Sequence, residues 1–120
     1  MVQRTSANYA VGAFEGDELI GVANFVCCDD PAVAEAAIAV AQQDHLRGAA
    51  TALLRHLVHA ARRKRIRYFA ADILAENDMM LRVLRDSGWP CTKRSDDSVL
   101  HVRIDLSARD GREAAGRRAC

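Results

Sequence analysis

The sequence predicts one domain of the mixed α/β (α+β) class over residues 1–106, with a mixed, mostly antiparallel sheet flanked by helices. Three observations predict this class. Several short apolar runs are typical of strands, one long run has helical spacing, and 120 residues that are 50% hydrophobic suffice for a single core. Residues 107–120 contain four arginines, two acids and no large apolar side chain, so we expect a disordered tail there.

The first two predicted strands form a hairpin. Tyr9–Glu15 and Leu19–Val26 are apolar runs separated by a polar segment in which Gly16 can supply the positive φ of a tight turn. Asp29-Asp30-Pro31 ends the second strand, because proline has no N–H to donate to a ladder.

Residues 32–65 are rich in alanine and leucine, and helix propensity alone would predict one long helix there. We predict instead a short buried strand at Glu35–Val40 and a polar break at Asp44–Gly48. Beyond the break an amphipathic helix is predicted at Gly48–Lys64. Its apolar residues recur at helical spacing, and they are Ala50, Leu53, Leu54, Leu57, Val58 and Ala61.

The second half of the chain is predicted to complete the sheet. Arg67–Leu74 reads as a strand, which makes a βαβ-like crossover with the elements before it. Asn77 is predicted to cap a second helix that ends at Ser87-Gly88. Apolar and polar residues alternate through Leu100–Leu106, which predicts a half-buried strand paired with Cys91–Ser95.

Charge and composition argue against several classes of function. Seventeen basic and sixteen acidic residues leave a net charge of +1, so no nucleic-acid partner is expected. No apolar stretch approaches the roughly 20 residues of a membrane helix, and we expect no membrane partner and a cytoplasmic location. The four cysteines have neither metal-site spacing nor the spacing of a disulfide framework, so we expect them to be reduced. His56 and His59 lack a third ligand at a suitable spacing, so we expect no metal.

The segment from His45 to Thr51 lies between a predicted buried strand and the start of the long helix. Unpaired backbone N–H groups and the positive end of a helix attract phosphates, and small residues let an anion approach the backbone. A pyrophosphate cradle is one interpretation of Gly48, Ala49 and Ala50. The other is a strand-to-helix turn whose small residues allow close packing.

These elements, in this order, resemble the GNAT superfamily of N-acetyltransferases, and most of all the GNAT domain of bacterial Pat-type protein lysine acetyltransferases. The loop resembles the motif Q/R-x-x-G-x-G/A, with His45 where Gln or Arg is usual and with Gly48 and Ala50 in the later positions. Residues 34–40 resemble the strand before that motif. Residues 74–89 resemble a later strand-to-helix unit that ends on Gly-Phe, here Gly-Trp.

The resemblance implies an acyltransferase with acetyl-CoA as co-substrate, which acetylates a primary amine on a protein lysine or a small molecule. It implies that the backbones of Ile38 and Val40 contact the pantetheine arm. Asn77 matches an asparagine that lies near this arm, and a role as helix cap is an equal interpretation. The pyrophosphate would meet the loop residues His45, Leu46, Arg47, Gly48, Ala49, Ala50 and Thr51.

Glu35 is the carboxylate of the strand before the loop, and the resemblance implies that it is the catalytic base. Such a base is needed because an ammonium group cannot attack a thioester until it loses a proton. The alternative interpretation is a solvated surface glutamate. Leu84 stands where many members of the superfamily have a tyrosine that is thought to protonate the leaving thiolate.

The resemblance also implies an N-terminally truncated domain, because the first strand and two helices of the superfamily have no counterpart. The strand at Tyr9 would then lie at a sheet edge, and we expect a homodimer through that exposed edge. Two other functions stay open: a non-catalytic CoA-binding or regulatory module derived from a GNAT domain, and a small interaction domain without a cofactor.

Overall fold

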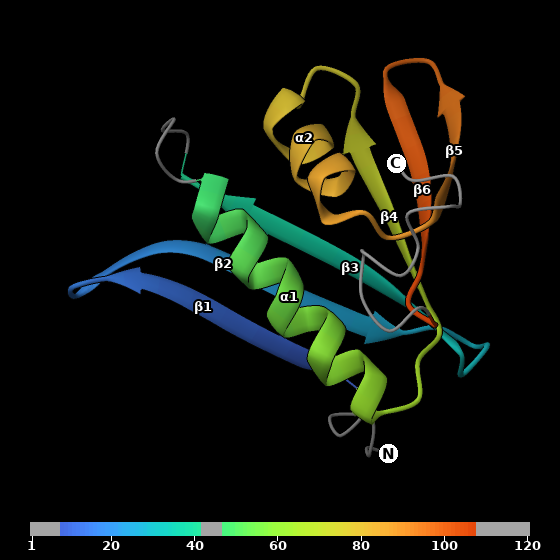
Figure 1. Cartoon of the computed structure of the whole chain (residues 1–120), viewed down its shortest axis with the longest axis horizontal. Coiled ribbons are helices and arrows are strands. Elements are labelled where there is room, and N and C mark those ends of the chain that lie inside the picture. The colour runs from blue at the N-terminus through green and yellow to red at the C-terminus, as the bar shows by residue number, and fades with distance from the viewer. Residues whose placement is uncertain (1–7, 42–46, 108–120) are drawn as a thin grey trace.

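The computed structural model describes residues 8–41 and 47–107, which form one sheet with two helices packed on the same face (Figure 1). The strands are β1 (Tyr9–Glu15), β2 (Glu18–Cys27), β3 (Val33–Val40), β4 (Tyr68–Leu74), β5 (Cys91–Asp96) and β6 (Val99–Asp105), and the helices are α1 (Arg47–Arg63) and α2 (Asp78–Ser87). The strand order is β1-β2-β3-β4-β6-β5.

Among the described strands, only β3 and β4 are parallel, and the other four pairs of neighbours are antiparallel. This arrangement confirms the predicted mixed, mostly antiparallel sheet. The parallel pair follows from the crossover, because α1 carries the chain back to the starting end of β3 before β4 begins. The structure confirms the predicted strand followed by a helix in place of the single long helix that propensity alone would favour across residues 32–65.

The predicted turns and caps are present. Gly16 has a φ of 63° in the β1–β2 hairpin, and Gly88 has a φ of 77° at the C-terminal end of α2. A β-bulge between Ala13 and Phe14, which the sequence did not indicate, shifts the hairpin register by one residue. After β2 the chain turns at Asp30, whose side chain accepts a hydrogen bond from the Ala32 N–H at 3.0 Å.

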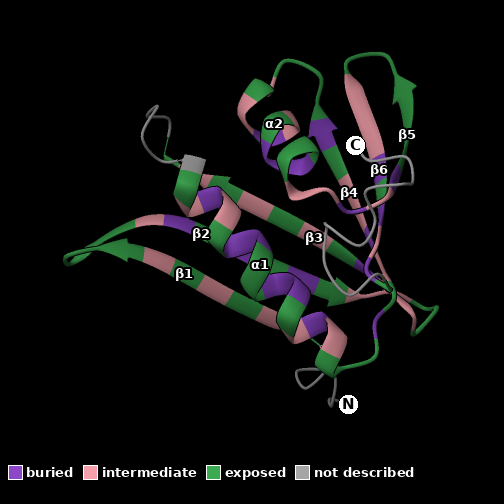
Figure 2. Ribbon diagram, in the orientation of Figure 1, coloured by how far each residue is buried: buried purple, intermediate pink, exposed green. Residues whose placement is uncertain are grey.

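The core lies between the sheet and the two helices, and buried and exposed residues alternate along the strands (Figure 2). Phe25 of β2 and Phe69 of β4 are fully buried, with ring centroids 5.6 Å apart. Leu53 and Leu57 of α1 and Val83 of α2 belong to the same buried cluster. The core therefore ties both helices to the middle of the sheet.

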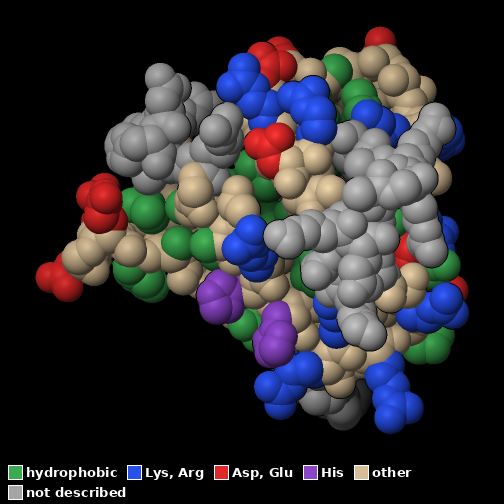
Figure 3. All heavy atoms as spheres, viewed as in Figure 1, with side chains coloured by type: hydrophobic (Ala, Val, Ile, Leu, Met, Phe, Trp, Pro, Cys, Tyr) green, Lys and Arg blue, Asp and Glu red, His purple; other side chains and the backbone are tan. Residues whose placement is uncertain are grey.

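The opposite face of the sheet is covered by no helix among residues 8–41 and 47–107. Val22 and Val26 of β2 and Leu74 of β4 are exposed there. On the face that carries the helices, basic and acidic side chains are interspersed (Figure 3). Neither described helix has the length and apolar character of a membrane-spanning segment.

The cysteines correct one expectation. Cys27 and Cys28 form no disulfide, but Cys91 at the start of β5 is disulfide-bonded, so the expectation of reduced thiols is wrong for Cys91. A disulfide requires that two side chains approach in space, and linear spacing does not reveal this. Residues 108–120 of the predicted tail lie outside the described residues.

Candidate functional site

The central feature of the sheet is a gap between β3 and β4. The two strands pair at three positions only, Val33 with Tyr68, Ala34 with Phe69 and Glu35 with Ala70. Beyond these pairs β3 stays bonded to β2 and β4 stays bonded to β6, so the two strands diverge (Figure 1). The facing backbone edges of residues 36–40 and 71–73 are therefore left without a strand partner. Backbone N–H and C=O groups that are shielded from water require a hydrogen-bond partner.

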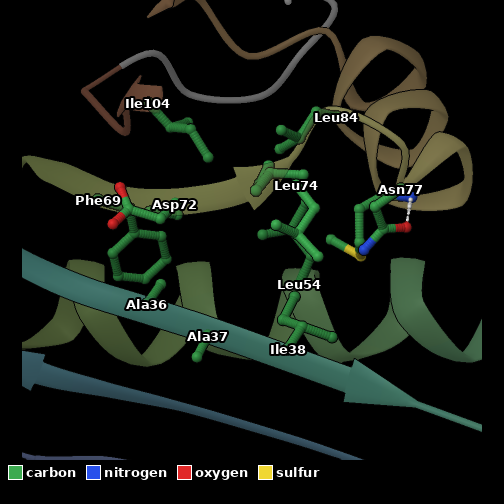
Figure 4. A pocket seen from close by; sticks show the side chains of 13 residues that line it. Ala36, Ala37, Ile38, Leu54, Phe69, Asp72, Leu74, Asn77, Leu84 and Ile104 are labelled. Carbon is green, nitrogen blue, oxygen red and sulfur yellow. Dashed lines mark hydrogen bonds between the residues drawn. The ribbon is translucent and has the colours of Figure 1, made fainter. Parts of the chain in front are cut away.

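A cleft of about 180 Å³ occupies this gap. Figure 4 shows side chains of β3 and β4 facing each other across it, with α1 behind and α2 at one end. Most of the lining is apolar, and Asp72 and Asn77 are its polar side chains. The lining residues are Ala36, Ala37, Ile38, Leu54, Phe69, Ala71, Asp72, Ile73, Leu74, Asn77, Met80, Leu84 and Ile104.

The start of α1 has open space around its backbone. A Cβ atom added to Gly48, the second residue of the helix, would meet no atom within 4 Å. The first turn of α1 contains no acidic residue, so within that described turn no carboxylate offsets the positive helix end. Gly48 is exposed, Ala49 and Thr51 are half-buried, and Ala50 is fully buried in the core.

The predicted loop is thus only partly described. His45 and Leu46 lie outside the described residues, and Arg47 is described through its backbone as the first residue of α1. Because Ala50 packs in the core, its small side chain also has the structural role that the alternative interpretation assigned to it. The packing interpretation is therefore confirmed for Ala50, and the pyrophosphate cradle at Gly48 stays a prediction.

Asn77 joins two roles at the edge of the cleft. Its Oδ1 accepts a hydrogen bond from the Met80 N–H at 3.2 Å, which confirms the predicted cap of α2. The side chain also lines the cleft, and its amide nitrogen lies on the cleft side in Figure 4. Capping uses the acceptor of this amide and leaves its N–H donors available to a ligand.

Glu35 lies where β3 and β4 separate. It is exposed, it pairs with Val26 on β2 and with Ala70 on β4, and it is not among the residues that line the cleft. The nearby thiol of Cys28 has a raised pKa because of burial and, secondarily, because of the negative charge of Glu35. The carboxylate thus stands at the narrow end of the gap, on the face without helices.

The side chain of Ile38 lines the cleft and that of Val40 does not, and the contact of the Ile38 backbone with a pantetheine arm stays a prediction. Val40 still lies on the open edge of β3, so its predicted backbone role stays a prediction. Leu84 of α2 is buried and lines the cleft, so its position supplies no hydroxyl group to the site.

One polar cluster was missed by the sequence analysis. His101 of β6 is directly opposite Asp72 of β4, and its Nδ1 lies 2.6 Å from Oδ1 of Asp72. Its Nε2 lies 3.5 Å from Oδ2 of Asp96 on β5. The alternating pattern of Leu100–Leu106 indicated a polar face for His101, but its partners depend on the register of three strands. In the described residues no group of three or more His, Cys, Asp or Glu side chains is arranged for a metal ion.

Solved structures share this fold. The GNAT domain of S. lividans Pat is 30% identical, with a TM-score of 0.69, over 82% of this chain and 61% of that domain. YncA from Salmonella typhimurium, solved with its cofactor acetyl-CoA, is 17% identical with a TM-score of 0.71, over 88% of this chain and 69% of that one. Ribosomal-protein-alanine N-acetyltransferase from Brucella melitensis is 18% identical with a TM-score of 0.67, over 84% and 70% of the two chains.

This chain therefore spans less than two thirds of the S. lividans Pat domain. No curated protein matches it. Residues 2–89 match the acetyltransferase (GNAT) family, which is more than half of the 120 residues. The match includes the β3–α1–β4 crossover and the cleft between its strands. The chain belongs to the acetyltransferase (GNAT) family.

Proposed function

We propose that this chain is an N-acetyltransferase that uses acetyl-CoA to acetylate a primary amine. The observation that carries the proposal is the cleft between β3 and β4, in which an apolar lining meets two backbone edges without strand partners. An extended chain with amide groups can add to such an edge as another strand. The pantetheine arm of acetyl-CoA has this chemistry.

The size of the cleft suits a slender chain such as the pantetheine arm. Pockets that bury a whole drug-sized ligand measure roughly 300–1,000 Å³. The cleft measures about 180 Å³, which suits a slender chain. In this proposal the backbones of Ile38 and Val40 bind the arm, and the amide of Asn77 donates to one of its carbonyl groups. YncA, whose structure contains acetyl-CoA, supports the choice of ligand.

The start of α1 is proposed to bind the pyrophosphate. Gly48 leaves the backbone N–H groups of the first turn accessible, and the positive helix end favours an anion. The basic residues in the last turn of α1 are Arg62 and Arg63. They are too distant to bind the pyrophosphate at the start of the helix, because 17 residues of helix span about 25 Å. Arg62 instead donates from Nε to the Leu106 carbonyl at 3.0 Å and lies over the Trp89 ring.

When bound, acetyl-CoA supplies the activated acetyl thioester, and the protein must supply a group that takes the proton of the amine. We propose Glu35 for this role, because it is exposed where the two strands separate. The likeness to the S. lividans Pat domain supports a protein lysine as the acceptor. That the reaction takes place in the cytoplasm stays a prediction.

A second function, a CoA-binding module without catalysis, is favoured by the apolar Leu84 in the cleft lining. Two measurements separate the candidates. Calorimetry with acetyl-CoA detects binding, and release of free thiol in the presence of a lysine peptide detects transfer. Binding with amine-dependent thiol release supports the enzyme, binding alone supports the module, and the absence of binding contradicts both.

A further inference from the structure

The polar cluster on β4, β5 and β6 adjoins the cleft through one residue. Asp72 lines the cleft, and its carboxylate is fixed by the bond of 2.6 Å to Nδ1 of His101. The side chain of Asp72 is 69% exposed and that of His101 is 32% exposed, so Asp72 is the member that faces solvent. An exposed carboxylate usually samples several rotamers, and here a partly buried ring holds it in one.

Asp72 and Glu35 lie on the same face of the sheet. Glu35 pairs with Ala70, and Asp72 lies two residues beyond Ala70, which is a rise of about 7 Å along β4. Residues two apart on a strand share a face. The two carboxylates therefore flank the narrow end of the cleft on the face that no described helix covers. This is an arrangement that attracts an ammonium group.

Of the two carboxylates, Asp72 has the better geometry for proton transfer. Glu35 does not line the cleft, whereas Asp72 does, and Oδ1 of Asp72 is already engaged by His101. Its Oδ2 is then left for an incoming amine. A carboxylate can only accept, so Nδ1 of His101 donates a hydrogen bond to Oδ1 of Asp72 across 2.6 Å.

We propose that Asp72 takes the first proton, that of the acceptor ammonium, with His101 as its positioning residue, and that Glu35 receives the second proton, which the nitrogen loses after attack. This inference rests on the proposed function and refines it. The ammonium loses one proton to Asp72, and its nitrogen forms the new bond to the acetyl carbon. The C–S bond breaks, its electron pair stays on sulfur, and the second proton, which Glu35 has received from the nitrogen, yields the free thiol.

The surroundings of His101 hold the ring in place. Asp96 lies 3.5 Å from Nε2 on the side of β5, and Arg94 of β5 is directly opposite His101 in the strand register. Arg103 is on the same face of β6, but its guanidinium lies 4.5 Å from the centroid of the Tyr68 ring. Asp72 is therefore the acid that connects this group to the cleft.

The test compares two acceptors in the full chain. A lysine peptide carries an ammonium group that must lose a proton, whereas the terminal nitrogen of phenylhydrazine is already unprotonated at neutral pH. Asp72→Asn should lower kcat/KM for the peptide about 10²- to 10⁴-fold, because a general base contributes that much. It should change the rate with phenylhydrazine little and leave the Kd of acetyl-CoA unchanged. His101→Gln should show the same pattern with a smaller loss, up to about 10²-fold.

The control variant is Asp97→Asn in the exposed β5–β6 turn, which removes the same charge from a residue that does not line the cleft. Asp97 has a φ of 60°, a conformation that asparagine adopts readily. Circular dichroism confirms the fold of each variant. Unchanged peptide acetylation by Asp72→Asn overturns this inference and leaves the proposed function intact. An equal loss of rate with both acceptors also overturns the inference and also leaves the proposed function intact. A parent protein that binds acetyl-CoA but transfers to neither acceptor overturns the inference and favours the module. A parent protein that does not bind acetyl-CoA overturns the proposed function as well.

Discussion

Replacing Gly48 with glutamate should raise the stability of this protein and lower its affinity for acetyl-CoA. Gly48 is exposed in the first turn of α1, and an added Cβ meets nothing within 4 Å, so the fold has room for the side chain. Glutamate favours a helix over glycine by roughly 0.5–1 kcal/mol. A carboxylate near the positive helix end adds about 0.3–1 kcal/mol, and no acid occupies that turn in the native chain.

The same carboxylate would lie beside the proposed pyrophosphate. Two like charges about 4 Å apart repel by roughly 1 kcal/mol in bulk water and by about 4 kcal/mol near a protein surface. Since 1.4 kcal/mol is about a factor of ten, the Kd of acetyl-CoA should rise at least 5-fold and up to about 10³-fold. The effect on binding and the effect on folding have opposite signs, which a general loss of structure cannot produce.

The assay combines thermal unfolding with calorimetry for three variants at this position. Gly48→Ala adds only the Cβ, Gly48→Gln adds a neutral side chain of similar length, and Gly48→Glu adds the charge. The excess loss of affinity in the glutamate variant should shrink as salt increases, because the interacting groups are exposed. A folded Gly48→Glu protein that binds acetyl-CoA as tightly as the parent would refute the reasoning and place the anion site elsewhere.

Three further predictions follow from the same structure. Glu35→Gln should lower turnover with a lysine peptide and leave the Kd of acetyl-CoA nearly unchanged, which steady-state kinetics and calorimetry measure. Unaltered turnover across pH would remove Glu35 from the mechanism. Burial and, secondarily, the charge of Glu35 raise the pKa of Cys28, which lowers the fraction of reactive thiolate. Alkylation of Cys28 by iodoacetamide should therefore be slower than that of a free cysteine peptide and faster in Glu35→Gln than in the parent. Peptide mass spectrometry measures both rates. Since this pKa is raised in the folded state, the unfolded chain loses its proton first, and the contribution of Cys28 to stability should decline as pH rises through that range. Finally, β1 pairs only with β2 among the described strands, so its other backbone edge is open, and we propose that the chain self-associates through that edge. Light scattering over a concentration series should show a mass that rises with concentration. A constant monomer mass would contradict the proposal.

Local patterns in the sequence determined the type and order of the elements. The helical spacing through α1, the alternation through β6 and the turn residues Gly16 and Gly88 each act over a few positions, so they can be read without knowledge of the fold. Asn77 was identified as a cap for the same reason, since a cap bonds to a backbone N–H three residues away.

The sequence also determined part of the candidate site. The strand before α1 was predicted from Glu35 and begins at Val33, and its apolar pattern alone placed Ile38 in the strand that precedes the helix. The order of strand, loop and helix was enough to indicate the family. The role of Glu35 stays a prediction, because the geometry shows where it lies and not what it does.

The tertiary structure alone decided where β3 and β4 separate. Pairing stops after Glu35 and Ala70, although nothing in either strand's own pattern marks that position. The cleft exists because each strand is bonded to a different outer neighbour and α1 and α2 cover one side of the gap. Strand pairing is a contact between residues distant in sequence, so a local pattern does not specify its extent.

The same physical reason explains the residues that the sequence did not reveal. Asp72 and His101 are 29 positions apart, and they meet because β4 and β6 pair in a register that places them opposite each other. A shift of that register by one residue would turn His101 to the other face of the sheet. The disulfide bond of Cys91 likewise depends on approach in space. Local periodicity thus determined the elements and their order, whereas the cleft and the Asp72–His101 pair beside it arose from the register between strands.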